Sequence, residues 1–196
     1  MFDLGGVLID WSPRYLYSKI WNDPSEVDYF LKNICNMAWN SQQDAGRSFA
    51  EAEEVLIVEY PEYKEAIRSY FQRWPEMLNG LVQGMEEIFD DLFERYPLYA
   101  LTNWSTETFP FACQRYDRLL NAFQDIVVSG EEKHIKPQEE LFNILLTRNG
   151  LEARESVLID DSLVNVETAR QLGFTALHFV NAAQLKLDLQ SLRLMD

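Results

Sequence analysis

Apolar and polar positions divide the chain into two regions with different periodicities. From Ser12 to about Leu81 the pattern is that of successive helices, without an alternating β-branched run. Ser12 and Pro13 form a helix start, with serine as N-cap and proline at the first helical position. The run from Ser48 to Glu51 matches a capping box, and the helix that it opens is expected to end before Pro61. A further helix is expected over residues 62–74. This region predicts a small bundle of about four or five helices.

After Gly84 short apolar runs alternate with amphipathic segments. Strands are expected at about 98–102, 126–128, 157–159 and 176–180, and helices at 85–96, 106–115, 137–148, 163–172 and 182–194. Short apolar strands that alternate with helices are typical of a parallel sheet covered on both faces.

The first strand lies far from the others, at Phe2–Asp3, ahead of the helical region. Only Met1 and Phe2 precede Asp3, so we expect either a stunted first strand or native residues upstream. The predicted fold class is therefore α/β: a doubly wound, Rossmann-like parallel-sheet core (1–12 and 82–196) with an inserted α-helical cap (13–81).

Composition narrows the classes of partner. The chain has 196 residues, 47% of them hydrophobic, which suits one domain or one domain with an insertion. A formal net charge of −15 argues against nucleic acid as a partner, because phosphate backbones need clustered Lys and Arg. No apolar run is long enough to span a membrane, and the two distant cysteines fit reduced thiols. We expect a cytoplasmic monomer or weak dimer with no membrane contact.

Polar residues recur where the predicted strands end. In parallel α/β sheets the ligand lies beyond the carboxyl ends of the strands, so these residues are expected to meet at one site. They are Asp3 and Gly5 after the first strand, Thr102-Asn103 after the second, Lys136 at the helix after the third, and Asp160-Asp161 after the fourth.

Their chemistry suits a phosphate ester and a magnesium ion. Asp3 and Asp161 offer the hard oxygen ligands that Mg²⁺ prefers. Lys136 offers a positive charge between a carboxylate and a phosphate. Thr102 and backbone N–H groups near Asn103 and the two glycines can hold phosphoryl oxygens. A carboxylate that attacks phosphorus forms an aspartyl-phosphate, a known form of covalent catalysis.

The four motifs together resemble those of the haloacid dehalogenase-like (HAD) hydrolase superfamily. The resemblance covers essentially the whole chain, and the helical insertion is similar to the cap of the β-phosphoglucomutase-like subgroup. The motifs are Phe-Asp-Leu-Gly-Gly-Val-Leu, Leu-Thr-Asn-Trp-Ser, Ile-Lys-Pro and Leu-Ile-Asp-Asp-Ser, in this order.

The resemblance implies a role for each matching residue. Asp3 is then the nucleophile and a metal ligand, Asp161 is a second metal ligand supported by Asp160, and the Gly5 carbonyl also serves the metal. It further implies that Thr102 and Asn103 contact the phosphate and that Lys136 neutralises it.

Gly5 departs from the pattern of most phosphatases in the superfamily, which carry a second aspartate there as general acid/base. The motif resembles a branch with Asp-x-Gly-Gly, whose members are described as phosphatases of small metabolites and, loosely, as dehalogenases. Loss of a positioned acid typically removes about 10²–10⁴-fold in rate. Asp10 and, from the cap, Asp44 are candidate substitutes, although a solvated loop acid is the favoured interpretation of Asp10.

Three further side chains are candidates for substrate contact. Asp44 and Arg47 flank a glycine between two helices of the cap, where a plain turn is an equally good explanation. Trp104 follows Thr102-Asn103 and lies either at the mouth of the pocket or in the core.

We therefore predict a Mg²⁺-dependent phosphatase of a small phosphorylated metabolite, with a sugar phosphate as one candidate. The alternatives are a haloacid dehalogenase, in which Asp3 attacks carbon without a metal, and a non-catalytic HAD scaffold. The pair Asp160-Asp161 argues against the dehalogenase, and the presence of Asp3, Lys136 and Asp161 argues against the scaffold.

Overall fold

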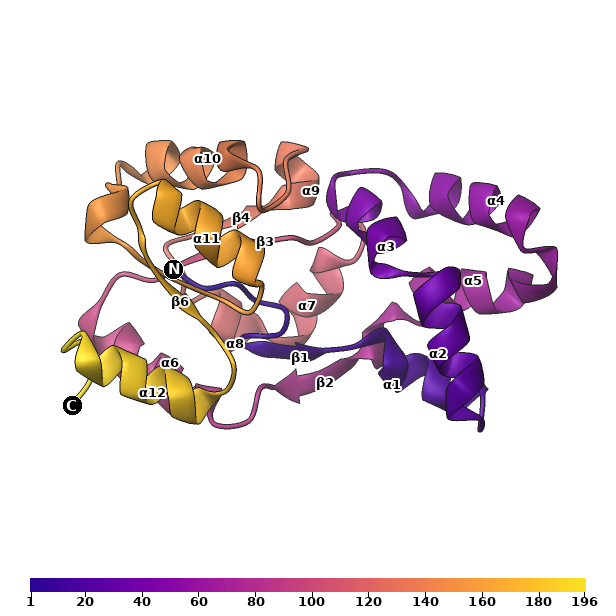
Figure 1. The fold of residues 1–196 in the computed structure, drawn as a ribbon, viewed down its shortest axis with the longest axis horizontal. Coiled ribbons are helices and arrows are strands. Elements are labelled where there is room, and N and C mark those ends of the chain that lie inside the picture. Colours follow the sequence, from indigo (N-terminus) through magenta and orange to yellow (C-terminus); the bar gives the residue numbers. More distant parts are fainter.

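A parallel sheet lies at the centre of the computed structural model, which describes all 196 residues (Figure 1). Strand β3 (Tyr99–Thr102) pairs in parallel with β4 (Asp125–Val128), and β5 (Val157–Asp160) pairs in parallel with β6 (Thr175–His178). The four strands are short and mostly buried, as expected for strands covered on both faces.

The first residues of the chain join these two strand pairs. Phe2 forms parallel bridges to Ala100 of β3 and to Ile159 of β5. The backbone N–H of Phe2 donates to the Tyr99 carbonyl at 2.9 Å, and that of Asp3 donates to the Ile159 carbonyl at 2.9 Å. The first strand of the sheet is thus a segment of a few residues, and it leaves Asp3 at the carboxyl edge between β3 and β5.

Helices cover both faces of this sheet, as predicted for a doubly wound fold (Figure 1). Helices α10 (Glu139–Asn149) and α11 (Leu163–Gln171) pack on one face. Helices α6 (Met85–Arg95) and α12 (Ala182–Ser191) contact each other and lie on the other face, where Phe89 meets Phe2 at 5.9 Å between ring centroids. The shorter helices α7 (Phe109–Arg115), α8 (Asp117–Leu120) and α9 (Ser129–Glu132) connect strands, with a 3₁₀ turn at Ala153–Glu155.

The region between Pro13 and Met77 is helical and lies to one side of the sheet (Figure 1). Ser12 caps the first helix through the N–H of Arg14, and both hydrogen bonds of the Ser48 capping box form. The elements are α1 (Pro13–Ile20), α2 (Pro24–Asn33), α3 (Met37–Asp44), α4 (Phe49–Glu59), a 3₁₀ turn (Pro61–Tyr63), α5 (Lys64–Gln72) and a 3₁₀ turn (Trp74–Met77).

Two expectations about this region were wrong. The helix predicted over 62–74 is shorter, because prolines 61 and 75 each open a separate 3₁₀ turn around α5. The chain is also not helical up to Leu81, since β2 (Leu78–Leu81) pairs antiparallel with β1 (Ile9–Trp11). These two strands carry the chain from the sheet to the helical region and back (Figure 1). The division into a core domain (1–12 and 82–196) and a cap domain (13–81) stays a prediction. We call residues 13–77 the cap region.

None of the helices combines the length and the apolar character that a membrane span requires. Both cysteines are free thiols, and Cys35 is buried in the cap region.

Candidate active site

A cavity of about 430 Å³ lies between the carboxyl edge of the sheet and the cap region. Helix α3 and the turn at Trp74 close it on the cap side, and the loops after β3 and β5 close it on the sheet side. Its lining consists of Asp3, Gly5, Gly6, Trp11, Met37, Asn40, Ser41, Asp44, Trp74, Asn103, Trp104, Thr108, Lys136, Pro137, Asp161, Ser162, Val164 and Asn165.

Lys136 ties two carboxylates together at the floor of this cavity. Its ammonium Nζ lies 3.0 Å from Asp3 Oδ2 and 2.7 Å from Asp160 Oδ2. All three residues are at least nine-tenths buried, so each charge is screened little by water. Asp160 also accepts hydrogen bonds from the Ser162 N–H and the Asn165 Nδ2, each at 2.9 Å. Asp160 is therefore held on both carboxylate oxygens, and it fixes Lys136 beside Asp3.

Asp161 completes a group of three carboxylates that suits a divalent cation. One oxygen each from Asp3, Asp160 and Asp161 lies within 4.8 Å of the others. Asp161 is exposed, unlike Asp160, so its carboxylate faces the cavity. Three hard oxygen donors at this spacing fit the preferences of Mg²⁺. The grouping brings together Asp3 and Asp161, which the sequence nominated as metal ligands, and Asp160, which was expected to support them; the metal-binding role stays a prediction.

The two adjacent glycines in the loop after Asp3 have different surroundings. Gly6 has φ +79°, and a Cβ built there would lie 2.4 Å from Asp161 Oδ2. Gly5 has no left-handed φ, and a Cβ built there would meet no heavy atom within 4 Å. The backbone therefore requires glycine at position 6, whereas position 5 has free space around it.

Burial dominates the electrostatics of the site. It raises the pKa of Asp3 to about 7, with Lys136 opposing the rise and Asp160 and Asp161 adding to it. Burial alone would lower the pKa of Lys136, but the two neighbouring carboxylates raise it above its usual value. The pKa of Asp161 is also raised, first by desolvation and then by the charge of Asp160. A cation bound among these carboxylates would stabilise their ionised forms.

Thr102 and Asn103, the adjacent polar residues at the end of β3, have different surroundings. The side-chain amide of Asn103 forms two hydrogen bonds with the backbone of Lys136. Its Nδ2 donates to the Lys136 carbonyl at 3.0 Å, and its Oδ1 accepts from the Lys136 N–H at 2.7 Å. Asn103 lines the cavity, but its side chain is used to position Lys136. Thr102 is 1% exposed at the end of β3 and does not line the cavity. Contact of either residue with phosphate stays a prediction.

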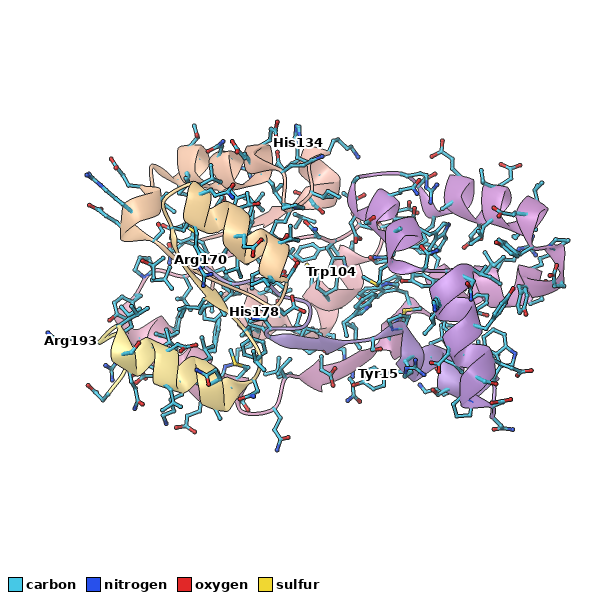
Figure 2. The ribbon with its side chains drawn as sticks, viewed as in Figure 1. Tyr15, Trp104, His134, Arg170, His178 and Arg193 are labelled. Atoms are coloured by element: carbon cyan, nitrogen blue, oxygen red, sulfur yellow. The ribbon has the colours of Figure 1, made fainter.

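Two tryptophans line the cavity with indole N–H groups that have no hydrogen-bond partner. Trp104 is 5% exposed and packs against Trp74, with ring centroids 5.4 Å apart. Figure 2 shows it between the sheet and the cap region. The Nε1 atoms of Trp104 and Trp11 are both buried and unpaired.

Of the two candidate residues in the cap region, Asp44 lines the cavity and Arg47 does not. Asp44 ends α3, lines the cavity and receives a hydrogen bond from Asn40 Nδ2 at 2.9 Å. Arg47 lies outside the lining; its Nε donates to Gln43 Oε1 at 2.8 Å, and its guanidinium also reaches the Trp39 carbonyl at 3.4 Å. Arg47 thus holds the end of α3 instead of facing the cavity.

Sequence reasoning missed several residues of the lining. Asn165 holds Asp160 from the first turns of α11, and Trp11, Asn40 and Trp74 come from elements that frame the cap side. The sequence motifs do not indicate Trp11, Asn40 or Trp74, because only the tertiary fold brings these residues to the sheet edge. Asp10 belongs to another surface, where it accepts hydrogen bonds from the Tyr15 hydroxyl and from Asn79.

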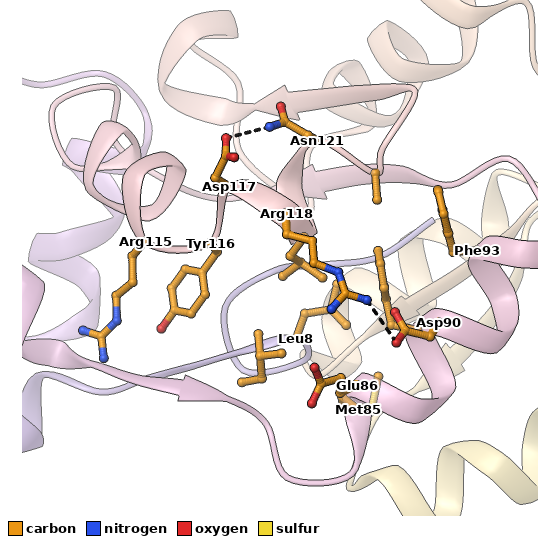
Figure 3. A pocket seen from close by; sticks show the side chains of 14 residues that line it. Leu8, Met85, Glu86, Asp90, Phe93, Arg115, Tyr116, Asp117, Arg118 and Asn121 are labelled. Atoms are coloured by element: carbon orange, nitrogen blue, oxygen red, sulfur yellow. Dashed lines mark hydrogen bonds and ion pairs between the residues drawn. The ribbon is translucent and has the colours of Figure 1, made fainter.

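A second cavity, of about 620 Å³, lies between α6 and the α7–α8 segment (Figure 3). Two of its acidic groups have partners within the lining: Arg118 pairs with Asp90 at 3.5 Å, and Asn121 donates to Asp117 at 2.6 Å. It contains none of the nominated site residues. The chemistry of the lining, and not its size, therefore identifies the smaller cavity as the candidate active site.

The chain is similar to known proteins over most of its length. The sequence profile of the haloacid dehalogenase-like hydrolases matches residues 1–179. The chain is 20% identical over 195 residues to a D-ribitol-5-phosphate phosphatase of Bacteroides thetaiotaomicron, covering 96% of this chain and 95% of the relative.

Two solved structures are similar in fold. The HAD-hydrolase YfnB of Bacillus subtilis, bound to magnesium, superimposes with a TM-score of 0.73 at 20% identity, covering 96% of both chains. A HAD family enzyme of Bacteroides thetaiotaomicron, in complex with magnesium and inorganic phosphate, superimposes with a TM-score of 0.67 at 24% identity, covering 92% of both. The chain belongs to the haloacid dehalogenase-like hydrolase family.

Proposed function

We propose that this hydrolase is a Mg²⁺-dependent phosphatase of a small phosphorylated metabolite, with Asp3 as the nucleophile. The observation that carries the proposal is the cluster of Asp3, Asp160 and Asp161 on the sheet side of the cavity, with Lys136 paired to the first two. The similarity to a D-ribitol-5-phosphate phosphatase, and to a HAD family enzyme in complex with magnesium and inorganic phosphate, supports Mg²⁺-dependent phosphate ester hydrolysis.

Asp3, Asp161 and the Gly5 carbonyl would hold the metal. Asp160 is less suited to bind it directly, because Lys136, Ser162 and Asn165 occupy its oxygens. A bound Mg²⁺ would supply a positive charge against the phosphoryl oxygens and the carboxylates.

The chain's own residues provide the remaining steps. An oxygen of Asp3 attacks phosphorus, the ester P–O bond breaks with its electrons on the leaving oxygen, and an aspartyl-phosphate forms. Lys136 stays between Asp3 and the phosphoryl group and neutralises part of the charge that develops there. Water then attacks phosphorus, releases inorganic phosphate and restores the Asp3 carboxylate.

The lining indicates a neutral, hydroxylated leaving group, such as a sugar or a polyol. Lys136 is the only basic residue in the lining, and both of its contacts are already carboxylates. A second phosphate or a carboxylate on the substrate would therefore find no cation. The neutral polar side chains of Asn40 and Ser41 suit hydroxyl groups instead. The same lack of a cation disfavours a 2-haloacid, because its carboxylate would be unpaired.

The test is phosphate release from a panel of sugar and polyol monophosphates, with Mg²⁺ and with EDTA. We expect activity that vanishes in EDTA, returns with Mg²⁺, and falls by about 10²-fold or more in Asp161→Asn. Asp10→Asn is the matched control, because Asp10 lies outside the cavity. Metal-independent chloride release from 2-chloropropionate, without phosphate release, would overturn the proposal.

A further inference from the structure

The proposed phosphatase lacks, on the sheet side of the cavity, the aspartate that protonates the leaving group in most phosphatases of the superfamily. Position 5, where a second aspartate would stand, is glycine, and free space surrounds its Cα. An alkoxide leaving group needs a proton as the P–O bond breaks, because its conjugate acid is far weaker than any side-chain carboxyl. Another element must deliver that proton if alkyl esters are to be cleaved quickly.

We propose that Asp44, from the cap region, is the general acid/base of the reaction. Asp44 is the last residue of α3, and its side chain lines the cavity that contains Asp3 and Asp161. It is near enough to Asp3 for the two carboxyl groups to interact electrostatically. Asp10 cannot take this role, because Tyr15 and Asn79 hold it on another surface.

A chain of hydrogen bonds fixes the Asp44 carboxyl. Asn40 Nδ2 donates to Asp44 Oδ2 at 2.9 Å, and the Tyr70 hydroxyl donates to Asn40 Oδ1 at 2.9 Å. Asn40 and Tyr70 are 6% and 0% exposed, so water competes little for these bonds. From the sheet side, the Ser129 hydroxyl donates to the Asp44 backbone carbonyl at 2.6 Å. The carboxyl is therefore held from the cap side by Asn40, and the Asp44 backbone is held from the sheet side by Ser129.

The surroundings of Asp44 bring the pKa of its carboxyl close to neutrality. No lysine or arginine forms an ion pair with Asp44. Burial raises the pKa of Asp44 to about 7, the charge of Asp3 raises it further, and the backbone N–H of Ser105 offsets part of the rise. A carboxyl with a pKa near neutrality can both donate and accept a proton under physiological conditions.

The two half-reactions balance with this residue, and the assignment rests on the proposed phosphatase function. As Asp3 attacks phosphorus, the leaving oxygen takes the electron pair of the broken P–O bond and the proton of Asp44, and the alcohol departs. The Asp44 carboxylate then accepts a proton from water while the water oxygen bonds to phosphorus and the bond to Asp3 breaks. Inorganic phosphate leaves, and Asp44 is protonated again.

The experiment compares Asp44→Asn with native protein on two esters that differ in leaving group. p-Nitrophenolate departs without a proton, whereas a primary alkoxide does not. We expect kcat/KM for a primary alkyl phosphate to fall by about 10²–10⁴-fold, and the rate of p-nitrophenol release in the first turnover to change little. Because water attack also loses its base, p-nitrophenol should appear as a burst of one equivalent per enzyme, followed by slow turnover.

Controls separate proton transfer from structural support. Asn at position 44 can still accept the Asn40 hydrogen bond, and Asp10→Asn makes the same change outside the cavity and should behave as native protein. Asp44→Ser provides a second variant with the same expectation. Gly5→Asp added to Asp44→Asn should restore the alkyl ester rate, because Gly5 has an ordinary φ and room for a side chain.

An equal loss on both esters without a burst, or no loss on the alkyl ester, would overturn the assignment of Asp44 alone. Native protein that releases phosphate from no ester would overturn the proposed function, and this assignment with it. The two failures are therefore distinguishable.

Discussion

The sheet side and the cap side of the active-site cavity are built in opposite ways. On the sheet side, Asp3, Lys136 and Asp160 form a compact set of ion pairs at 3.0 and 2.7 Å. On the cap side the lining is neutral except for Asp44, which has a neutral amide as its hydrogen-bond partner. The cap-side lining comprises Trp11, Met37, Asn40, Ser41, Asp44 and Trp74.

This difference separates two tasks. On the sheet side, Lys136 compensates part of the charge of Asp3 and Asp160, and a bound cation would compensate the rest, including Asp161. On the cap side, the buried Asp44 carboxyl has hydrogen bonds but no cation, so its ionised form is unfavourable. We infer that residues of the sheet side carry out phosphoryl transfer, and that residues of the cap side bind the alcohol and protonate its leaving oxygen. Variants on the two sides should therefore change different kinetic quantities.

The largest effect is expected from Asp3→Asn, on the sheet side. Loss of the nucleophile should reduce kcat by at least about 10⁴-fold on every ester, including p-nitrophenyl phosphate. The fold should persist, because Lys136 keeps its 2.7 Å contact with Asp160 and one of three clustered carboxylates is neutralised. Steady-state rates and thermal unfolding measure the two effects. More than a few per cent of native activity in the purified variant would contradict the aspartyl-phosphate route.

A smaller effect should separate the two glycines that follow Asp3. Gly6→Ala forces a left-handed φ on alanine, at a cost of about 1–2 kcal/mol, and brings Cβ against Asp161. We expect a Tm lower by roughly 2–8 °C. We also expect a lower affinity for Mg²⁺, because the added Cβ displaces the Asp161 carboxylate. Gly5→Ala should change Tm by less than about 2 °C, because neither backbone nor neighbours oppose it. Equal Tm changes in the two variants would contradict the observed loop geometry.

The sheet side could be predicted from the sequence because its residues follow strands that the sequence also shows. Short apolar runs precede Asp3, Asn103 and Asp160, and parallel strands bring their carboxyl ends to one edge. What the residues do there was less predictable. Thr102 and Asn103 are adjacent, yet Thr102 is buried in β3, whereas the amide of Asn103 forms hydrogen bonds with the Lys136 backbone.

The cap side depends on contacts between distant segments, which local patterns do not reveal. Strand β1 has three residues, and β2 contains Asn79-Gly80, which have low strand propensity, so only their mutual pairing identifies them. Asp44 and Arg47 are three residues apart and looked equivalent in the sequence. The end of α3 turns Asp44 toward the cavity, while Arg47 folds back to Gln43. Such directions follow from packing and not from residue type.

The smallest effect is expected from the indole N–H groups, and it concerns recognition instead of chemistry. Trp11→Phe and Trp104→Phe each remove one buried, unpaired donor from opposite sides of the cavity and keep an aromatic ring. If these donors bind substrate hydroxyls, KM for a polyol phosphate should rise by roughly 2- to 12-fold per variant, the value of one ordinary hydrogen bond. KM for p-nitrophenyl phosphate, which has no hydroxyl to bind, should stay constant. Trp39→Phe is the matched control, because Trp39 has an unpaired N–H but does not line the cavity. A rise in KM for both esters would mean that the rings act by shape alone. No rise for the polyol phosphate would place its hydroxyls against Asn40 and Ser41 instead, and would leave the two indole groups without a role in binding.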